Sequence, residues 1–148
     1  MAGDTYRSVR LERTSLGRYR AENPRGGSIP LGEGDDADFT PVELLLAAIA
    51  GCTAVDVDHI TAKRAEPDTF AVAASGDKIR DESGNRMTNL AVTFHVTFPD
   101  GDSGDAARAV LPRAVAQSHD RLCTVSRTVE SGASVDTRIE APETRGGG

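Results

Sequence analysis

The stretch that decides the fold is residues 40–55, TPVELLLAAIAGCTAV. Thr40 is a favourable N-cap residue, Pro41 suits the first helical position, and Glu43 completes a capping box three residues after the cap. The residues that follow are apolar on every side of a helix, a pattern typical of a buried helix. We therefore expect a helix over residues 41–64, about 36 Å long, whose first half is buried and which forms the spine of the domain.

The length and composition of the chain indicate one domain with a lean core. Its 148 residues match the commonest domain size. Hydrophobic residues make up 38% of the chain and aromatic residues 4%, so small aliphatic side chains must build the core. Such a core favours a surface shared with a second copy of the chain. We expect a single domain over residues 1–141 and a disordered, glycine-rich tail over residues 142–148.

The charge and the apolar runs exclude several classes of partner. The net charge is -6 and no long basic run is present, which argues against nucleic-acid binding. The N-terminus lacks a signal-peptide pattern, and the 10 apolar residues from Val42 to Gly51 are too few to span a bilayer. We therefore expect a cytoplasmic protein with no membrane partner. Its two cysteines should then be reduced, and either metal-binding, reactive or merely buried.

Shorter signals on both sides of the long helix predict an α+β domain. Expected strands cover residues 5–12, 18–21, 70–75, 89–98 and 133–140. Residues 23–38 are rich in glycine, proline and aspartate, which predicts a long functional or mobile loop with room for one more short strand. A second helix is expected over residues 105–119, where Pro112 forces a kink or a late start. Thr124 is the expected cap of a last helix that ends at residue 131.

Both cysteines lie at landmarks of the predicted helices. Cys52 lies in the middle of the buried helix, and Cys123 lies where two helical segments meet. A buried cysteine often serves only as a small hydrophobic residue, and a nucleophilic Cys52 would need a cation aimed at its sulfur. Arginines that could serve an anionic site crowd the first 25 residues: Arg7, Arg10, Arg13, Arg18, Arg20 and Arg25.

Two other interpretations stay open at this point. His59 follows Cys52 by seven residues on the same helix face, and His119 precedes Cys123 by four. These four residues could form a two-Cys, two-His metal site, although their spacings match no compact zinc motif. The remaining alternative is a non-enzymatic module whose apolar pocket binds a small molecule and whose cysteines are incidental.

Two motifs resemble those of the OsmC/Ohr family. Residues 39–54, FTPVELLLAAIAGCTA, resemble its signature helix, roughly S/T-P-x-E-L-L-L-A-A-L-A-x-C. Residues 119–126, HDRLCTVS, are similar to its second-cysteine motif, C-x-V-S before a short helix. The 71-residue separation of the cysteines and the order of the expected elements also match. The resemblance implies an OsmC-like fold, with antiparallel sheets packed around a long central helix, in an intertwined homodimer whose active site lies at the subunit interface.

The resemblance also implies a chemistry, that of an antioxidant thiol-dependent peroxidase acting on organic hydroperoxides. Cys52 would be the peroxidatic cysteine that becomes a sulfenic acid, and Cys123 the resolving cysteine that traps it as a disulfide. An external dithiol, a lipoyl group in the best-defined branch of the family, would then reduce both residues. This reaction needs no metal and no organic cofactor.

The glutamate and the arginine of the family site do not map directly. Many members carry a catalytic Glu ten residues before the first cysteine, where this chain has Val42, and Glu43 matches the P-x-E-L-L-L branch instead. Glu43 lies about 13.5 Å along the helix from Cys52 and roughly 180° around it. It could be only the capping residue, or it could serve a site through a partner subunit or a broken helix. For the arginine that ionises the thiol, Arg18 and Arg25 are the candidates, and Arg25 is preferred.

Overall fold

The computed structural model describes residues 5–140 as five strands and three α-helices, with a short π-helix before the last of them. The strands are β1 (Arg10–Ser15), β2 (Arg18–Glu22), β3 (Ser28–Leu31), β4 (Thr69–Asp81) and β5 (Gly84–Thr97). The helices are α1 (Pro41–Ala62), α2 (Asp102–Gln117), the π-helix η1 (Ser118–Leu122) and α3 (Thr124–Ser131). Helices combined with antiparallel sheets confirm the expected α+β class. The tail expected over residues 142–148 lies outside the described residues.

The capping box predicted at the start of the long helix is present. Thr40 Oγ1 accepts a hydrogen bond from the Glu43 N–H at 3.2 Å, and the Glu43 carboxylate accepts one from the Thr40 N–H at 2.9 Å. Two donors that a helix N-terminus leaves unpaired are thereby satisfied. The helix has 22 residues and ends at Ala62, two residues earlier than expected.

The expectation that the first half of α1 is buried is wrong for the single chain. The buried residues of the helix form one stripe: Ile49, Thr53, Val57 and Thr61. Their i, i+4 spacing is that of a single helix face, and α1 contacts α2, α3, η1 and β4. A stripe on the opposite face, formed by Ala48, Gly51 and Val55, is open to solvent, and Val55 is 57% exposed. A helix that is apolar all round needs cover on two sides, and this protomer covers one.

Length and composition alone would also let α1 cross a membrane, since an 18-residue window of it has a mean hydropathy of 1.5. The 10-residue run counted in the sequence understates this apolar length. In the single chain α1 packs on three helical segments and β4, and 22% of that window is buried.

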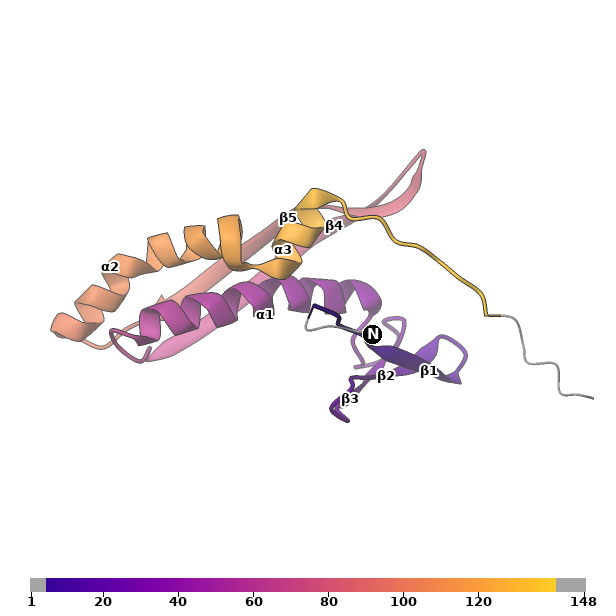
Figure 1. Cartoon of the computed structure of the whole chain (residues 1–148), viewed down its shortest axis with the longest axis horizontal. Coiled ribbons are helices and arrows are strands. Elements are labelled where there is room, and N and C mark those ends of the chain that lie inside the picture. Colours follow the sequence, from indigo (N-terminus) through magenta and orange to yellow (C-terminus); the bar gives the residue numbers. More distant parts are fainter. Residues whose placement is uncertain (1–4, 141–148) are drawn as a thin grey trace, which may run out of the picture.

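The N-terminal strands β1, β2 and β3 form an antiparallel sheet at the N-terminal end of α1, apart from the other strands (Figure 1). Gly17, with a φ of 71°, allows the turn between β1 and β2. The loop expected over residues 23–38 contains β3, and a bridge between Leu31 and Phe39 leads the chain into α1. Every residue of β1 is exposed, so this sheet covers little of its own protomer.

Strands β4 and β5 form a long antiparallel hairpin that runs along α1 (Figure 1). The strands expected over residues 70–75 and 89–98 are parts of these longer ones, which extend through polar residues to a turn before Gly84. Apolar cross-strand pairs lie on the half-buried face: Phe70–Val96, Val72–Phe94 and Ala74–Val92. The rings of Phe70 and Phe94 meet edge to face, with centroids 6.3 Å apart.

The second helix begins three residues earlier and ends two residues earlier than expected, and η1 leads from it to the second cysteine. Helix α2 begins at Asp102 and passes Pro112 without the late start that the proline suggested. The π-helix η1 follows directly after α2. The chain then turns into α3 (Figure 1). The cap of α3 is Cys123 and not Thr124, because the Cys123 sulfur accepts the hydrogen bond from the Ser126 N–H. Thr124 is the first helical residue instead.

The strand expected over residues 133–140 is wrong. This segment runs away from the helices (Figure 1), is exposed throughout and pairs with none of the described strands. A strand depends on hydrogen bonds to a neighbour, and alternation in the sequence cannot provide that neighbour.

Candidate functional site

The two cysteines meet in the fold although 71 residues separate them in the sequence. Cys52 lies in the middle of α1 and is half-buried, and Cys123 is fully buried at the start of α3. Both are free thiols, and their side chains interact with each other. The fold thus brings together the two residues that the sequence motifs single out.

The sulfur of Cys123 is held by Ser126. The two side chains are hydrogen-bonded with Sγ and Oγ 3.3 Å apart, and the Ser126 N–H donates to Sγ at 3.4 Å. Burial by itself raises the pKa of Cys123, but the hydrogen bonds from the Ser126 hydroxyl and N–H outweigh it, so the pKa lies below its usual value. The Cys52 thiol lowers the pKa further, whereas the Asp56 carboxylate opposes this. The thiolate of Cys123 is therefore favoured relative to that of an ordinary cysteine.

The environment of Cys52 differs from that of Cys123. Burial raises the pKa of the Cys52 thiol, and the neighbouring Cys123 raises it further. The backbone N–H groups of Val125 and Thr124 act in the opposite direction. These groups belong to the first turn of α3, where the partial positive charge of the helix favours an anion. Both sulfurs therefore share one helix N-terminus, and Cys123 is the more acidic of the two.

A buried serine connects the segments that carry the two cysteines. The Ser118 hydroxyl lies 2.8 Å from Thr53 Oγ1 and donates to an Asp56 carboxylate oxygen at 2.9 Å, both in α1. The Ser118 carbonyl accepts the N–H of Cys123 at 2.8 Å, five residues later, which is the hydrogen-bond pattern of a π-helix. No part of Ser118 is exposed.

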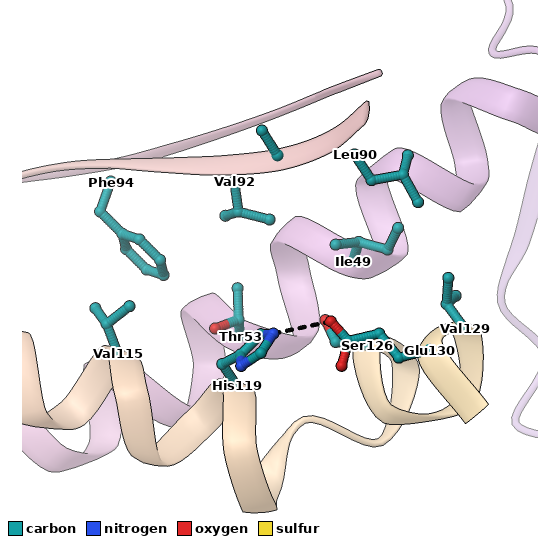
Figure 2. Close-up of a pocket in the computed structure, with 11 residues that line it drawn as sticks. Ile49, Thr53, Leu90, Val92, Phe94, Val115, His119, Ser126, Val129 and Glu130 are labelled. Atoms are coloured by element: carbon teal, nitrogen blue, oxygen red, sulfur yellow. Dashed lines mark hydrogen bonds and ion pairs between the residues drawn. The ribbon is translucent and has the colours of Figure 1, made fainter. Parts of the chain in front are cut away.

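A pocket of about 250 Å³ adjoins the cysteine pair, between β5, α1 and the helices that follow β5 (Figure 2). Its apolar walls are formed by Ile49, Leu90, Val92, Phe94, Val115 and Val129. Thr53 and Ser126 also line it, and they are respectively the chain neighbour of Cys52 and the hydrogen-bond partner of Cys123. An apolar group in this pocket would therefore lie next to the residues that hold the thiols.

His119 contacts two carboxylates, one beside it in η1 and one in α3. Its Nδ1 is 2.9 Å from Asp120 Oδ1, and its Nε2 is 2.9 Å from Glu130 Oε1, an interaction drawn in Figure 2. The carboxylates of Asp120 and Glu130 raise the pKa of His119 above its usual value. The imidazole is thereby favoured as a cation that ties the end of α3 to the turn before Cys123.

The residues of the metal-site alternative do not gather. His59 is exposed on α1, and His119 is engaged with its two carboxylates. Throughout residues 5–140, no group of three or more His, Cys, Asp or Glu residues could hold a metal ion.

The fold does not bring the candidate glutamate and arginines to the cysteines of the same chain. The Glu43 carboxylate caps α1, which is unbroken between Glu43 and Cys52. Arg18 instead pairs with three aspartates of the loop before α1: Asp35, Asp36 and Asp38. Arg25 is exposed in the turn between β2 and β3, where its N–H donates to Asn23 Oδ1 at 3.0 Å.

Sequence reasoning missed the polar residues that hold the cysteines. Ser126 is the last residue of the C-x-V-S motif, and its role as partner of the Cys123 sulfur could have been read from the three-residue spacing of an N-cap and its partner. Asp56 follows Cys52 by one helical turn, which is also readable from the sequence. Ser118 carries no such signal, because its partners are 62 and 65 residues away.

Comparison with known proteins gives a consistent family. A family model described as OsmC-like protein matches residues 32–138. An uncharacterized protein of Mycobacterium tuberculosis is 32% identical over 131 residues, which cover 87% of this chain and 93% of that protein.

Solved structures give the same fold. A hypothetical protein from Aquifex aeolicus superposes with a TM-score of 0.69 at 25% identity, covering 85% of this chain and 88% of that one. The organic hydroperoxide resistance protein OhrB of Bacillus subtilis superposes with a TM-score of 0.53 at 18% identity, covering 83% of this chain and 90% of that one. The comparison with OhrB, at 18% identity, shows a shared fold.

Proposed function

The chain belongs to the OsmC-like protein family, and we propose that it is a thiol-dependent peroxidase that reduces organic hydroperoxides through Cys52 and Cys123. The observation that carries this proposal is the meeting of two free thiols at the N-terminus of α3. A half-buried thiol beside a second, more acidic one suits a two-cysteine redox cycle.

The first step is the oxidation of Cys52. Its thiolate attacks the terminal oxygen of a hydroperoxide ROOH, so an S–O bond forms and the O–O bond breaks. The alkoxide takes up a proton and leaves as the alcohol ROH, and Cys52 becomes a sulfenic acid. The N–H groups of Thr124 and Val125 favour the thiolate that this attack requires.

The second step is the formation of the disulfide. The Cys123 thiolate attacks the sulfenic sulfur of Cys52, the S–S bond forms, and hydroxide leaves and takes up a proton to become water. The Ser126 N–H donates to this sulfur, and Ser126 lowers the pKa of Cys123, which favours its thiolate relative to that of an ordinary cysteine. An external dithiol, with a lipoyl group as the candidate, then reduces the disulfide and is itself oxidised to a disulfide. The cycle suits a reducing compartment such as the cytoplasm.

We propose further that the working form is a homodimer. The open stripe of α1, formed by Ala48, Gly51 and Val55, is apolar and exposed in the single chain. Strand β1 is exposed along its whole length as well. An interface over the stripe of α1 would bury apolar surface, as the interfaces of obligate dimers do.

A dimer would also supply what the thiol of Cys52 lacks. Burial raises the pKa of Cys52, so a cation is needed to hold its thiolate at neutral pH. Arg18 lies in β2 and Arg25 in the turn between β2 and β3, and this N-terminal sheet stands apart from α2 and α3 (Figure 1). Arg18 or Arg25 of the partner subunit, with Glu43 of the partner subunit as its orienting carboxylate, is the proposed source of that cation.

The apolar pocket supports the choice of organic hydroperoxides as substrates. Burying apolar area contributes about 25 cal/mol per Å², so a substrate tail of about 100 Å² would contribute about 2.5 kcal/mol. This free energy corresponds to nearly a hundredfold in binding. Hydrogen peroxide has no tail and gains none of it. We expect kcat/KM for an alkyl or aryl hydroperoxide to exceed that for hydrogen peroxide at least tenfold.

The test is a peroxidase assay that compares cumene hydroperoxide with hydrogen peroxide, with dithiothreitol or dihydrolipoamide as reductant. Cys52→Ser should abolish turnover, whereas Cys123→Ser should slow it and leave Cys52 open to overoxidation, detected by mass spectrometry. Full activity of Cys52→Ser would refute the peroxidase. No turnover by the wild-type chain with any dithiol, together with saturable binding of an apolar ligand, would favour the non-enzymatic binding module instead.

A further inference from the structure

Ser118 contacts both segments that carry a cysteine, and it is fully buried. Its hydroxyl donates to Asp56 at 2.9 Å, so the single hydroxyl proton of Ser118 is used there. The 2.8 Å contact between Thr53 Oγ1 and Ser118 Oγ must then be donated by Thr53. The result is a directed chain from Thr53 through Ser118 to Asp56, which fastens one residue of η1 at two points of α1.

The same residue fastens Cys123. The Ser118 carbonyl accepts the Cys123 N–H at 2.8 Å, so the backbone of Cys123 is fixed relative to the point where η1 meets α1. Thr53 directly follows Cys52, and Asp56 lies one helical turn further along α1. Cys52 therefore lies within four residues of both α1 residues that bond to Ser118. Cys123 is bonded to Ser118 directly.

A disulfide is demanding about the geometry of the residues that form it. The Cα atoms must lie within about 4.4–6.8 Å of each other, and deviations store strain in the bond. Holding two reacting groups in place also raises their effective concentration, which favours the bond between them. A buried, hydrogen-bonded link that fixes the position of one cysteine relative to the other affects both the strain in the disulfide and the effective concentration of the two thiols.

We propose that Ser118 is a positioning residue for the Cys52–Cys123 pair, and that its hydrogen bonds to Thr53 and Asp56 hold the two thiols in the relative position in which they form a disulfide. The π-helical turn of η1 contributes by placing the Ser118 carbonyl under the Cys123 N–H. This inference rests on the proposed function only in that the two cysteines form a disulfide, and it needs no hydroperoxide.

The test is the equilibrium between the full-length chain and the couple of reduced and oxidised dithiothreitol. In this exchange the two thiols lose two electrons to form the disulfide while oxidised dithiothreitol gains them, and thiol trapping followed by mass spectrometry counts each form. We expect Ser118→Ala to shift the equilibrium toward the dithiol at least tenfold, or about 30 mV for a two-electron couple. Thr53→Val, which removes one link and keeps the shape of the side chain, should shift it in the same direction by a smaller factor.

Thr61→Val is the matched control. Thr61 is also a fully buried hydroxyl of α1, but it bonds only to backbone carbonyls of its own helix, chiefly Val57 O at 3.0 Å. This variant should lose thermal stability and leave the dithiol equilibrium within twofold of the wild type. An equal shift in Thr61→Val and Ser118→Ala would overturn the inference, as would no shift in Ser118→Ala. If Ser118→Ala does not fold, the dithiol equilibria of Thr53→Val and Thr61→Val are compared instead. A shift in Thr53→Val that exceeds the one in Thr61→Val supports the inference, and equal shifts overturn it.

The design separates this inference from the peroxidase. A wild-type chain that forms the disulfide with oxidised dithiothreitol but reduces no hydroperoxide would refute the proposed function and leave the role of Ser118 standing. A wild-type chain that forms no disulfide between Cys52 and Cys123 would refute the role of Ser118.

Discussion

Replacing Ser126 should raise the pKa of Cys123 and slow the formation of the disulfide. In the folded chain the Ser126 hydroxyl lies 3.3 Å from the Cys123 sulfur, and its hydrogen bond is among the causes that hold the pKa of that thiol below its usual value. Ser126→Ala removes the hydroxyl and keeps the backbone N–H that caps α3. The thiolate therefore loses one of its two donors from this residue while the helix keeps its cap.

The size of the effect follows from the strength of one hydrogen bond to a charged group. Such bonds contribute about 1.5–3 kcal/mol, and the long contact to a diffuse sulfur anion places this one near the lower end. A loss of about 1.4 kcal/mol corresponds to a tenfold change in an equilibrium constant. At a pH where the thiol form dominates, the thiolate fraction of Cys123 should therefore fall about tenfold, and the rate of attack on the Cys52 sulfenic acid should fall with it.

The measurement is a titration of the ultraviolet absorbance of the thiolate in a Cys52→Ser background, which leaves one thiol to titrate and needs no reagent to reach a buried sulfur. Ser131→Ala is the control, because Ser131 belongs to the same helix and its hydroxyl donates to Thr128 O at 3.0 Å, away from the cysteines. An unchanged titration midpoint in Ser126→Ala, or an equal change in Ser131→Ala, would refute the reasoning.

Three further predictions concern stability and its pH dependence. Glu43→Gln can still accept the capping hydrogen bond and should unfold in urea like the wild type, whereas Glu43→Ala should lower the free energy of unfolding by about 1 kcal/mol. Equal losses of stability in the two variants would contradict the cap. If Glu43→Gln keeps its stability, any loss of activity in it reports catalysis alone. Gly104→Ala should lose at least about 2 kcal/mol and lower Tm, because a Cβ there would overlap the backbone oxygen of Pro99; an unchanged Tm would contradict that contact. Carboxylates raise the pKa of His119 in the folded chain, so its ion pair should stabilise the fold fully below the unfolded pKa of about 6.5 and lose this effect as the pH rises through the folded pKa. The amount by which Glu130→Gln lowers Tm relative to the wild type should therefore shrink over that pH range. A difference in Tm that grows with pH would contradict this.

Much of the fold could be predicted from local patterns. The capping box at Thr40 and Glu43, the long apolar helix and the strands expected over residues 70–75 and 89–98 are set by residues close together in the sequence, where propensity and periodicity act. The two cysteines were recognisable for a similar reason, because each lies in a short motif. Where local signals were weak, the boundaries moved: β4 extends through polar residues to Asp81, and α2 tolerates Pro112 within its length.

Contacts between distant segments decided the rest. The alternation of residues 133–140 predicted a strand, yet a strand exists only where a neighbour offers hydrogen bonds, and none of the described strands does so. The apolar faces of α1 are readable from its sequence, but which face is covered depends on where α2, α3 and β4 pack. The hydrogen bonds of Ser118 join residues more than 60 positions apart, and no pattern along the chain reports them. The sequence by itself therefore determined which residues could carry the chemistry, and only the tertiary structure decided how Cys52 and Cys123 are held, because burial and hydrogen bonding are properties of neighbours in space.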